Sequence, residues 1–287
     1  MSYQDLEGYI AEVFSSIQGE GGTVRGSTYG KRQIFIRFSG CNIATGDYRT
    51  TGCFWCDTPR AQMPETEYLI YEKILETEQF ENVKNPVKIS EIVQIIENII
   101  TPDLHSISIT GGEPLYQLEF MKELIKALSS AQINLPLYLE TNGSITLYEK
   151  DYTELAKYIK FCCCDIKDKS SKAALQFNWD DLLNNELDFI SKMIDHGVET
   201  FAKIVVTSQT TIEDIDKISK SLANIKYPNG ENVGLAIQPV MLGNEDLKTT
   251  HSIPIPHLIK IFSKASESLK PENLTLSIQA HKFLHIL

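Results

Sequence analysis

Six short apolar runs that alternate with stretches of helical periodicity constrain the fold of this 287-residue chain more than any other feature. The predicted strands are 33–38, 106–110, 136–140, 160–166, 201–206 and 235–240. The predicted helices are 90–100, 118–130, 147–158, 179–196, 211–225 and 256–269. Such alternation indicates an α/β fold with a parallel sheet, right-handed crossovers and strands buried on both faces. Six units of this kind predict an open, partial (β/α)6 barrel.

We expect residues 1–287 to form one domain, because no repeat of fixed period and no linker rich in Pro, Gly or Ser divides the chain. A charged, Glu-rich stretch at about 63–87 follows a cysteine-containing loop at 41–58 and looks like an insertion. Another segment of the chain precedes the first predicted strand as an N-terminal extension.

The charge balance limits the partners that the chain can bind. It carries 38 Asp and Glu residues against 27 Lys and Arg residues, a formal net charge of -11. Broad binding to nucleic acid or to an anionic membrane needs clustered cations, so we expect neither. No basic region followed by an apolar stretch begins the sequence, and no apolar run approaches the roughly 18 residues of a membrane span. We therefore expect a cytoplasmic protein.

The cysteines fall into two groups, which are Cys41, Cys53 and Cys56, and then Cys162, Cys163 and Cys164. A disulfide framework would scatter them along a short secreted chain, so metal ligation or burial is favoured. Successive residues of a strand point to opposite faces, and the second group therefore cannot converge on one metal. We expect the second group to be small buried apolar residues.

The first group places three thiols on one loop, directly after the first predicted strand. A closed structural zinc site takes four ligands, whereas a 4Fe-4S cluster held by three cysteines leaves one iron open. Spacing alone leaves three alternatives: such a cluster, a zinc site completed by a distant His, and ordinary buried thiols.

Polar motifs follow the other predicted strands, where the chemistry of parallel α/β folds is found. In Gly111-Gly112-Glu113-Pro114, two glycines let the backbone approach a ligand closely, and Glu113 offers a carboxylate. The corresponding motifs of the third, fourth and sixth predicted strands are Glu140-Thr141-Asn142-Gly143, Asp165-Ile166-Lys167 and Gln238-Pro239.

This series of motifs resembles the radical S-adenosylmethionine (radical SAM) superfamily. The resemblance implies that Cys41, Cys53 and Cys56 hold a 4Fe-4S cluster whose open iron binds S-adenosylmethionine. Its implied cofactor-binding residues are Gly112, Glu113, Thr141, Asp165, Lys167 and Gln238. The usual spacing is C-x3-C-x2-C, whereas eleven residues separate Cys41 from Cys53 here, an extra length that a flexible loop absorbs at small entropic cost. The usual Ser-x-Lys is replaced by Asp165-x-Lys167.

Within the superfamily, segments 14–21, 35–42, 56–58 and 279–284 are similar to the 7-carboxy-7-deazaguanine synthase family. This resemblance implies a pterin substrate, 6-carboxy-5,6,7,8-tetrahydropterin, which undergoes radical ring contraction with loss of ammonia after a 5'-deoxyadenosyl radical has abstracted hydrogen from C6. It also implies an electron donor such as flavodoxin or ferredoxin, and a homodimer.

The same resemblance assigns the substrate side of the site. Arg37 offers a planar fork for the substrate carboxylate, and Gln18 and Glu20 offer donors and acceptors for a pterin edge. Thr58 would be a ligand of Mg²⁺, and His281 would hold the far side of the substrate. The alternatives are that Glu20 and Arg37 form a surface ion pair and that His281 is an exposed residue of the chain end.

Two other functions remain open from the sequence. An activating enzyme that places a glycyl radical on a partner protein shares the cysteine loop and the Gly-Gly-Glu-Pro turn. A zinc-binding interaction module is the third reading of the cysteines. The sequence around Gln18 and Glu20 and the C-terminal His281 favour a small pterin over a partner protein.

Overall fold

The computed structural model describes residues 6–74, 79–131, 133–241, 252–280 and 282. Its main feature is a sheet with the strand order β12-β11-β10-β9-β8-β7-β3-β2-β4-β5. The six predicted strands are all confirmed and are parallel neighbours in chain order. They are β3 (Arg32–Phe38), β7 (Ser106–Gly111), β8 (Leu137–Thr141), β9 (Ile159–Ile166), β10 (Glu199–Val206) and β11 (Leu235–Pro239). A seventh parallel strand, β12 (Leu274–Leu276), continues the series.

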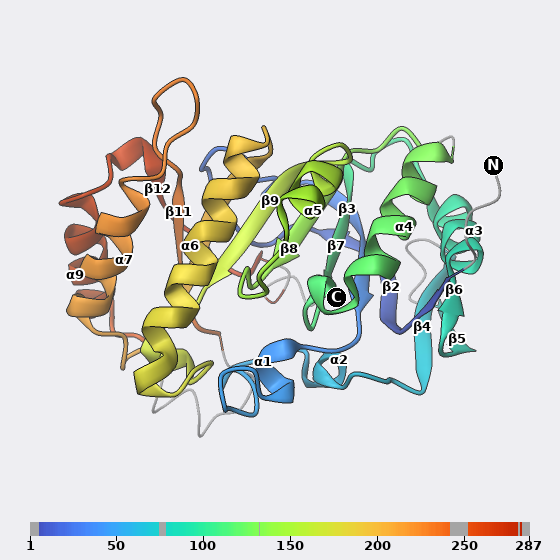
Figure 1. Ribbon diagram of the computed structural model, residues 1–287, viewed down its shortest axis with the longest axis horizontal. Coiled ribbons are helices and arrows are strands. Elements are labelled where there is room, and N and C mark those ends of the chain that lie inside the picture. The colour runs from blue at the N-terminus through green and yellow to red at the C-terminus, as the bar shows by residue number, and fades with distance from the viewer. Residues whose placement is uncertain (1–5, 75–78, 132, 242–251, 281, 283–287) are drawn as a thin grey trace.

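The predicted helices are also confirmed and lie along the sheet in chain order (Figure 1). They are α3 (Ile89–Ile99), α4 (Leu118–Ser130), α5 (Glu149–Leu155), α6 (Trp179–Asp195), α7 (Ile212–Leu222) and α9 (Ile255–Ser266). In α3 the buried residues include Ile89, Ile92, Ile96 and Ile99, a spacing of three and four that gives one apolar face. The described sheet is open, with β12 at one end and β5 at the other.

The two faces of the sheet have different surroundings because side chains alternate along each strand. One face, including Ile34, Ile36 and Ile107, packs into the main hydrophobic core. The other face carries Arg37 and Lys203, which line a cavity. Both faces of the sheet are therefore covered, as the sequence predicts. Helices cover one face, and the other face forms a wall of the cavity.

The N-terminal extension and the insertion enlarge the sheet. Strand β2 (Ile10–Ile17) pairs antiparallel with β3. The predicted insertion contains β4 (Tyr68–Ile74) and β5 (Gln79–Lys84), an antiparallel pair of which β4 joins β2. A separate short pairing links β1 (Glu7–Gly8) to β6 (Val87–Lys88). None of the helices in the described residues combines the length and apolar character needed to cross a bilayer.

Candidate active site

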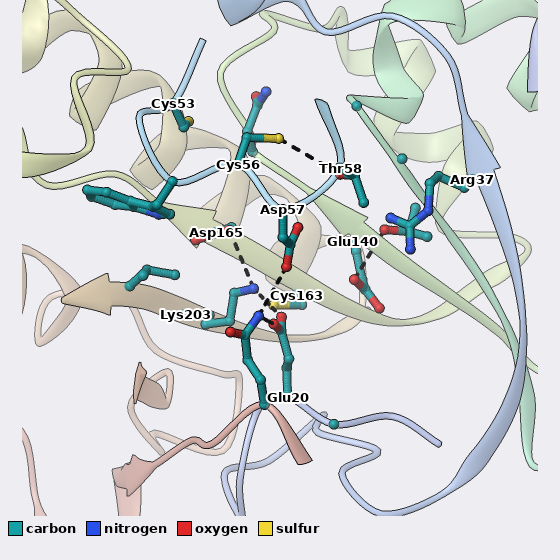
Figure 2. Close-up of a pocket in the computed structure, with 18 of the residues that line it drawn as sticks. Glu20, Arg37, Cys53, Cys56, Asp57, Thr58, Glu140, Cys163, Asp165 and Lys203 are labelled. Atoms are coloured by element: carbon teal, nitrogen blue, oxygen red, sulfur yellow. Dashed lines mark hydrogen bonds and ion pairs between the residues drawn. The ribbon is translucent and has the colours of Figure 1, made fainter. Parts of the chain in front are cut away.

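A cavity of about 490 Å³ collects nearly all of the predicted site residues. This volume lies within the usual range of small-molecule sites, about 300–1,000 Å³. In Figure 2, Cys53, Cys56 and Thr58 lie at the top of the view and Glu20 and Lys203 at the bottom. The predicted residues that line the cavity are Gln18, Glu20, Arg37, Cys41, Cys53, Cys56, Thr58, Gly112, Thr141, Asp165, Lys167 and Gln238. His281 lies outside the described residues.

The long cysteine loop is held against the segments that follow β8 and β9. The Tyr48 hydroxyl donates to the carbonyl of Ser144 at 3.0 Å, and the Thr50 hydroxyl donates to the carbonyl of Ala173 at 2.8 Å. One short helix, α1 (Asn42–Thr45), begins the lengthened part, and a second, α2 (Pro59–Gln62), follows the loop. The extra length thus packs on neighbouring segments while Cys41, Cys53 and Cys56 all remain on the cavity wall.

The donor set of this loop fits an iron-sulfur cluster. All three thiols are free, and burial raises the pKa of Cys41 and raises that of Cys53 to about 12. Metal binding displaces such protons, because the thiolate is the ligand. No three Cys, His, Asp or Glu side chains of the described residues converge as ligands of a single ion. A cluster does not require this convergence, since each thiolate binds its own iron.

The Gly-Gly-Glu-Pro turn is hydrogen-bonded to the segment that leads into the cysteine loop. The Gly112 amide donates to the carbonyl of Phe38 at 3.0 Å, and the Glu113 amide donates to the carbonyl of Gly40 at 2.7 Å. A Cβ at position 112 would lie 2.3 Å from the carbonyl oxygens of both Gly40 and Ala61. Only glycine therefore allows this approach of the turn to the loop.

The Glu113 side chain lies behind the cavity wall and not on it, which differs from the expectation of a direct cofactor contact. Its carboxylate accepts from the Leu115 amide at 2.9 Å, and from the Thr141 hydroxyl and the Asn142 amide at 2.7 Å each. Burial raises the pKa of Glu113 to about 7, although these donors oppose the rise. The sequence could not indicate this orientation, because the next strand supplies two of the donors.

We expect Glu113→Ala to lower the free energy of unfolding by about 3 kcal/mol, because three buried donors would lose their acceptor and each such loss costs about 1–3 kcal/mol. Urea unfolding of the purified protein measures the change. The matched control is Glu97→Ala, since Glu97 is exposed on α3 and an exposed change costs less than about 0.5 kcal/mol. A Glu113→Ala protein as stable as the wild type would contradict the supporting role.

Two predicted substrate residues have fixed orientations in the structure. The Gln18 amide nitrogen donates to Glu140 at 2.7 Å, while its oxygen accepts from the Glu20 amide at 3.1 Å. The Arg37 Nε donates to Glu12 at 2.8 Å, so the alternative ion pair between Arg37 and Glu20 is wrong. Glu20 pairs with Lys203 instead.

Buried charges that the sequence analysis did not assign complete the cavity. Glu140 accepts from Ser108 at 2.9 Å, and burial together with the nearby negative charge of Glu20 raises the pKa of Glu140. Lys203 lies within β10. A single Lys among the apolar residues of this strand is the sequence signal that could have identified it as a site residue. Burial alone would raise the pKa of Glu20, but Lys203 and two amide donors lower it to about 2.

The end of β9 carries the predicted pair of Asp165 and Lys167. The two side chains meet at 2.7 Å, as their spacing of two along one strand end predicts. Within the cysteine run of the same strand, Cys162 and Cys164 belong to the main core while Cys163 faces the cavity. The predicted alternation and burial of these thiols are confirmed.

Thr58 directly precedes α2 and lies beside the cysteine residues, with its hydroxyl oxygen 3.8 Å from the Cys56 sulfur. The neighbouring Asp57 was not assigned from the sequence. Its carboxylate accepts from Gln279 at 3.2 Å and pairs with Lys282 at 3.3 Å. These contacts bring the C-terminal segment to the same side of the cavity as Thr58.

Comparison with known proteins shows to which family the chain belongs. The model of the Radical SAM superfamily matches residues 36–222. The 7-carboxy-7-deazaguanine synthase of Thermococcus kodakarensis is 33% identical over 97% of this chain and 98% of its own length, and that of Methanocaldococcus jannaschii is 32% identical over 97% and 100%. A solved structure titled "Native anSMEcpe with bound AdoMet" has a TM-score of 0.49 at 16% identity, covering 80% of this chain and 60% of that one. The chain belongs to the radical SAM superfamily, whose members use a 4Fe-4S cluster and S-adenosylmethionine, and within it to the 7-carboxy-7-deazaguanine synthase family.

Proposed function

We propose that this protein converts 6-carboxy-5,6,7,8-tetrahydropterin to 7-carboxy-7-deazaguanine by ring contraction with loss of ammonia. Relatives that carry the name of this activity match nearly the whole chain. The observation that carries the proposal is the cavity, because one space contains the three-thiol loop, the Gly112 turn and the side chains of Gln18, Glu20 and Arg37.

In this proposal the cysteine loop and the end of β9 form the cofactor side of the cavity, and Gln18, Glu20 and Arg37 form the pterin side. Cys41, Cys53 and Cys56 would hold the cluster, and Gly112 with the end of β9 would hold S-adenosylmethionine. When bound, these groups supply the one-electron chemistry that starts the rearrangement of the pterin. The contribution of the chain is to bind both molecules, fix their orientation and exclude water.

The residues opposite the loop suit a carboxylated heterocycle with an N–H edge. Glu20 stays ionised and is therefore an acceptor for ring or amino N–H groups. The amide of Gln18 is held by Glu140, which fixes the position of this side chain without help from the substrate. The Arg37 guanidinium lines the cavity while its Nε binds Glu12, and its fork suits the substrate carboxylate.

Further parts of the proposal concern the surroundings of the reaction. Thr58 would bind Mg²⁺ with oxygens of the substrate and water, because hard cations prefer oxygen ligands.

Flavodoxin or ferredoxin would supply the electron. The enzyme would work as a homodimer in the cytoplasm, where thiols stay reduced. We treat the chain as a single domain, since the insertion and the core strands share one sheet.

The experiment is anaerobic reconstitution followed by turnover with the carboxylated tetrahydropterin, dithionite and S-adenosylmethionine. We expect mass spectrometry to find a product that has lost one ammonia, with ammonia released in equal amount. Reductive cleavage of S-adenosylmethionine with no change of the pterin would contradict the proposal. A protein-borne radical on a copurifying partner would favour the activating enzyme instead.

A further inference from the structure

A chain of alternating positive and negative side chains lines the cavity. Lys203 Nζ pairs with Glu20 Oε2 and lies 3.4 Å from Asp165 Oδ2. The same Asp165 oxygen lies 2.7 Å from Lys167 Nζ. Figure 2 shows Lys203 between Glu20 and Asp165. The Lys203 and Lys167 side chains are only 8% and 10% exposed, so water screens these charges weakly.

In the proposed arrangement, the two ends of this chain belong to the sites of different ligands. Glu20 lies on the proposed pterin side, whereas Asp165 and Lys167 lie at the end of β9 on the proposed cofactor side. Asp165 Oδ1 is buried and has no hydrogen-bond partner in the described residues. A buried carboxylate oxygen without a hydrogen-bond partner indicates that a bound molecule supplies the donor, such as a hydroxyl or an ammonium group.

We propose that Lys203 is a positioning residue that is shared by the two sides of the cavity and couples the binding of the pterin to the binding of S-adenosylmethionine. It holds Glu20 and Asp165 at once, so a ligand that draws on either carboxylate changes the contact of Lys203 with the other. Coupling of this kind is reciprocal between the two ligands. The inference rests on the proposed function, because it takes the pterin to bind at Glu20.

Among the groups around Glu20, Lys203 is the one that keeps the Glu20 carboxylate ionised. Gln238 on β11 donates to Glu20 at 3.0 Å and Gln279 donates at 2.9 Å, but both are neutral. The negative charge of Glu140 on β8 disfavours ionisation of Glu20, and Cys163 on β9 is a neutral thiol because burial raises its pKa. Asp165 on β9 shares the cation of Lys203 with Glu20. Without Lys203, burial would therefore favour the protonated form of Glu20.

The test measures binding in the reconstituted enzyme without reductant, so that no turnover occurs. We expect Lys203→Met to weaken pterin binding about 100-fold at neutral pH. The loss should grow as the pH falls from 9 to 6 and Glu20 of the variant takes up a proton, whereas Glu20 of the wild type stays ionised. Lys203→Arg keeps the cation and should restore the pH profile of the wild type.

A second arm measures the dissociation constant of S-adenosylmethionine with and without the pterin. We expect the pterin to change this constant about 10-fold in the wild type and not at all in Lys203→Met or in Asp165→Asn. Asp165→Asn keeps the ion pair of Lys203 with Glu20. The loss of coupling can therefore be measured in this variant even where Lys203→Met folds poorly.

Lys122→Met is the matched control, because Lys122 is also a buried lysine, 7% exposed and paired with Asp151 at 3.0 Å, but it lies in α4 away from the cavity. It should leave the pH profile and the coupling unchanged. A loss of pterin binding in Lys203→Met that is equal at every pH, or coupling that survives in Asp165→Asn, would overturn the inference. A wild-type enzyme that binds no pterin would instead overturn the proposed function.

Discussion

Cys53→Ala is expected to reduce the iron content of the anaerobically reconstituted protein to background and to abolish reductive cleavage of S-adenosylmethionine. Cys53 is one of three thiols on the cavity wall, and burial raises its pKa to about 12, so metal binding must displace and release the thiol proton to form the thiolate ligand. Iron and sulfide analysis, visible absorbance and detection of 5'-deoxyadenosine measure the result.

The matched control for this variant is Cys162→Ala. Cys162 is as buried as any residue of the core, but its side chain faces the helices and not the cavity. It should keep the iron content of the wild type, with a modest loss of stability from the missing sulfur. A Cys53→Ala protein that keeps a full cluster and cleaves the cofactor would show that this ligand assignment is wrong.

Arg37→Ala is expected to keep the cluster and the cleavage of S-adenosylmethionine but to lower kcat/KM for the pterin about 100-fold. Removing one partner of a buried charge pair costs about 2–5 kcal/mol, and each 1.4 kcal/mol is a factor of ten. Its side chain is 18% exposed and lies on the cavity face of β3. Steady-state kinetics with varied pterin measures the loss, and Arg37→Lys should restore little of it because a point charge lacks the planar fork.

Arg32→Ala provides the comparison on the same strand. Arg32 begins β3 and pairs with the exposed Asp103, so its removal should leave kcat/KM unchanged. Equal activity of Arg37→Ala and the wild type would contradict the carboxylate assignment, whereas equal losses in both variants would indicate a general effect on β3.

The core of the fold was predictable because buried parallel strands are continuous apolar runs. The six predicted strands β3, β7, β8, β9, β10 and β11 contain such runs, although Ser106 and Ser108 interrupt that of β7. Strand β2 was missed because Glu12, Ser15 and Ser16 interrupt its apolar residues, which suits an antiparallel strand. The hairpin of β4 and β5 was missed since it is charged and largely exposed, with Lys73 and Glu81 pairing across it.

The site was predictable as a set of motifs but not as a set of contacts. The cysteine loop and the strand-end motifs do meet in one cavity, because the carboxyl ends of parallel strands share one edge of the sheet. The partners of Glu20 could not be predicted, since Lys203 lies 183 positions away. Motif identity likewise does not fix where a side chain points, as Glu113 illustrates.

The central claim is that three thiols hold a cluster and leave one iron for S-adenosylmethionine inside the cavity that binds the pterin. Electron paramagnetic resonance of the reduced, reconstituted protein tests it most directly. We predict that adding S-adenosylmethionine shifts the signal of the cluster and that the pterin shifts it again. A signal that stays unchanged at saturating S-adenosylmethionine would show that no iron is open to the cofactor, and would contradict the account.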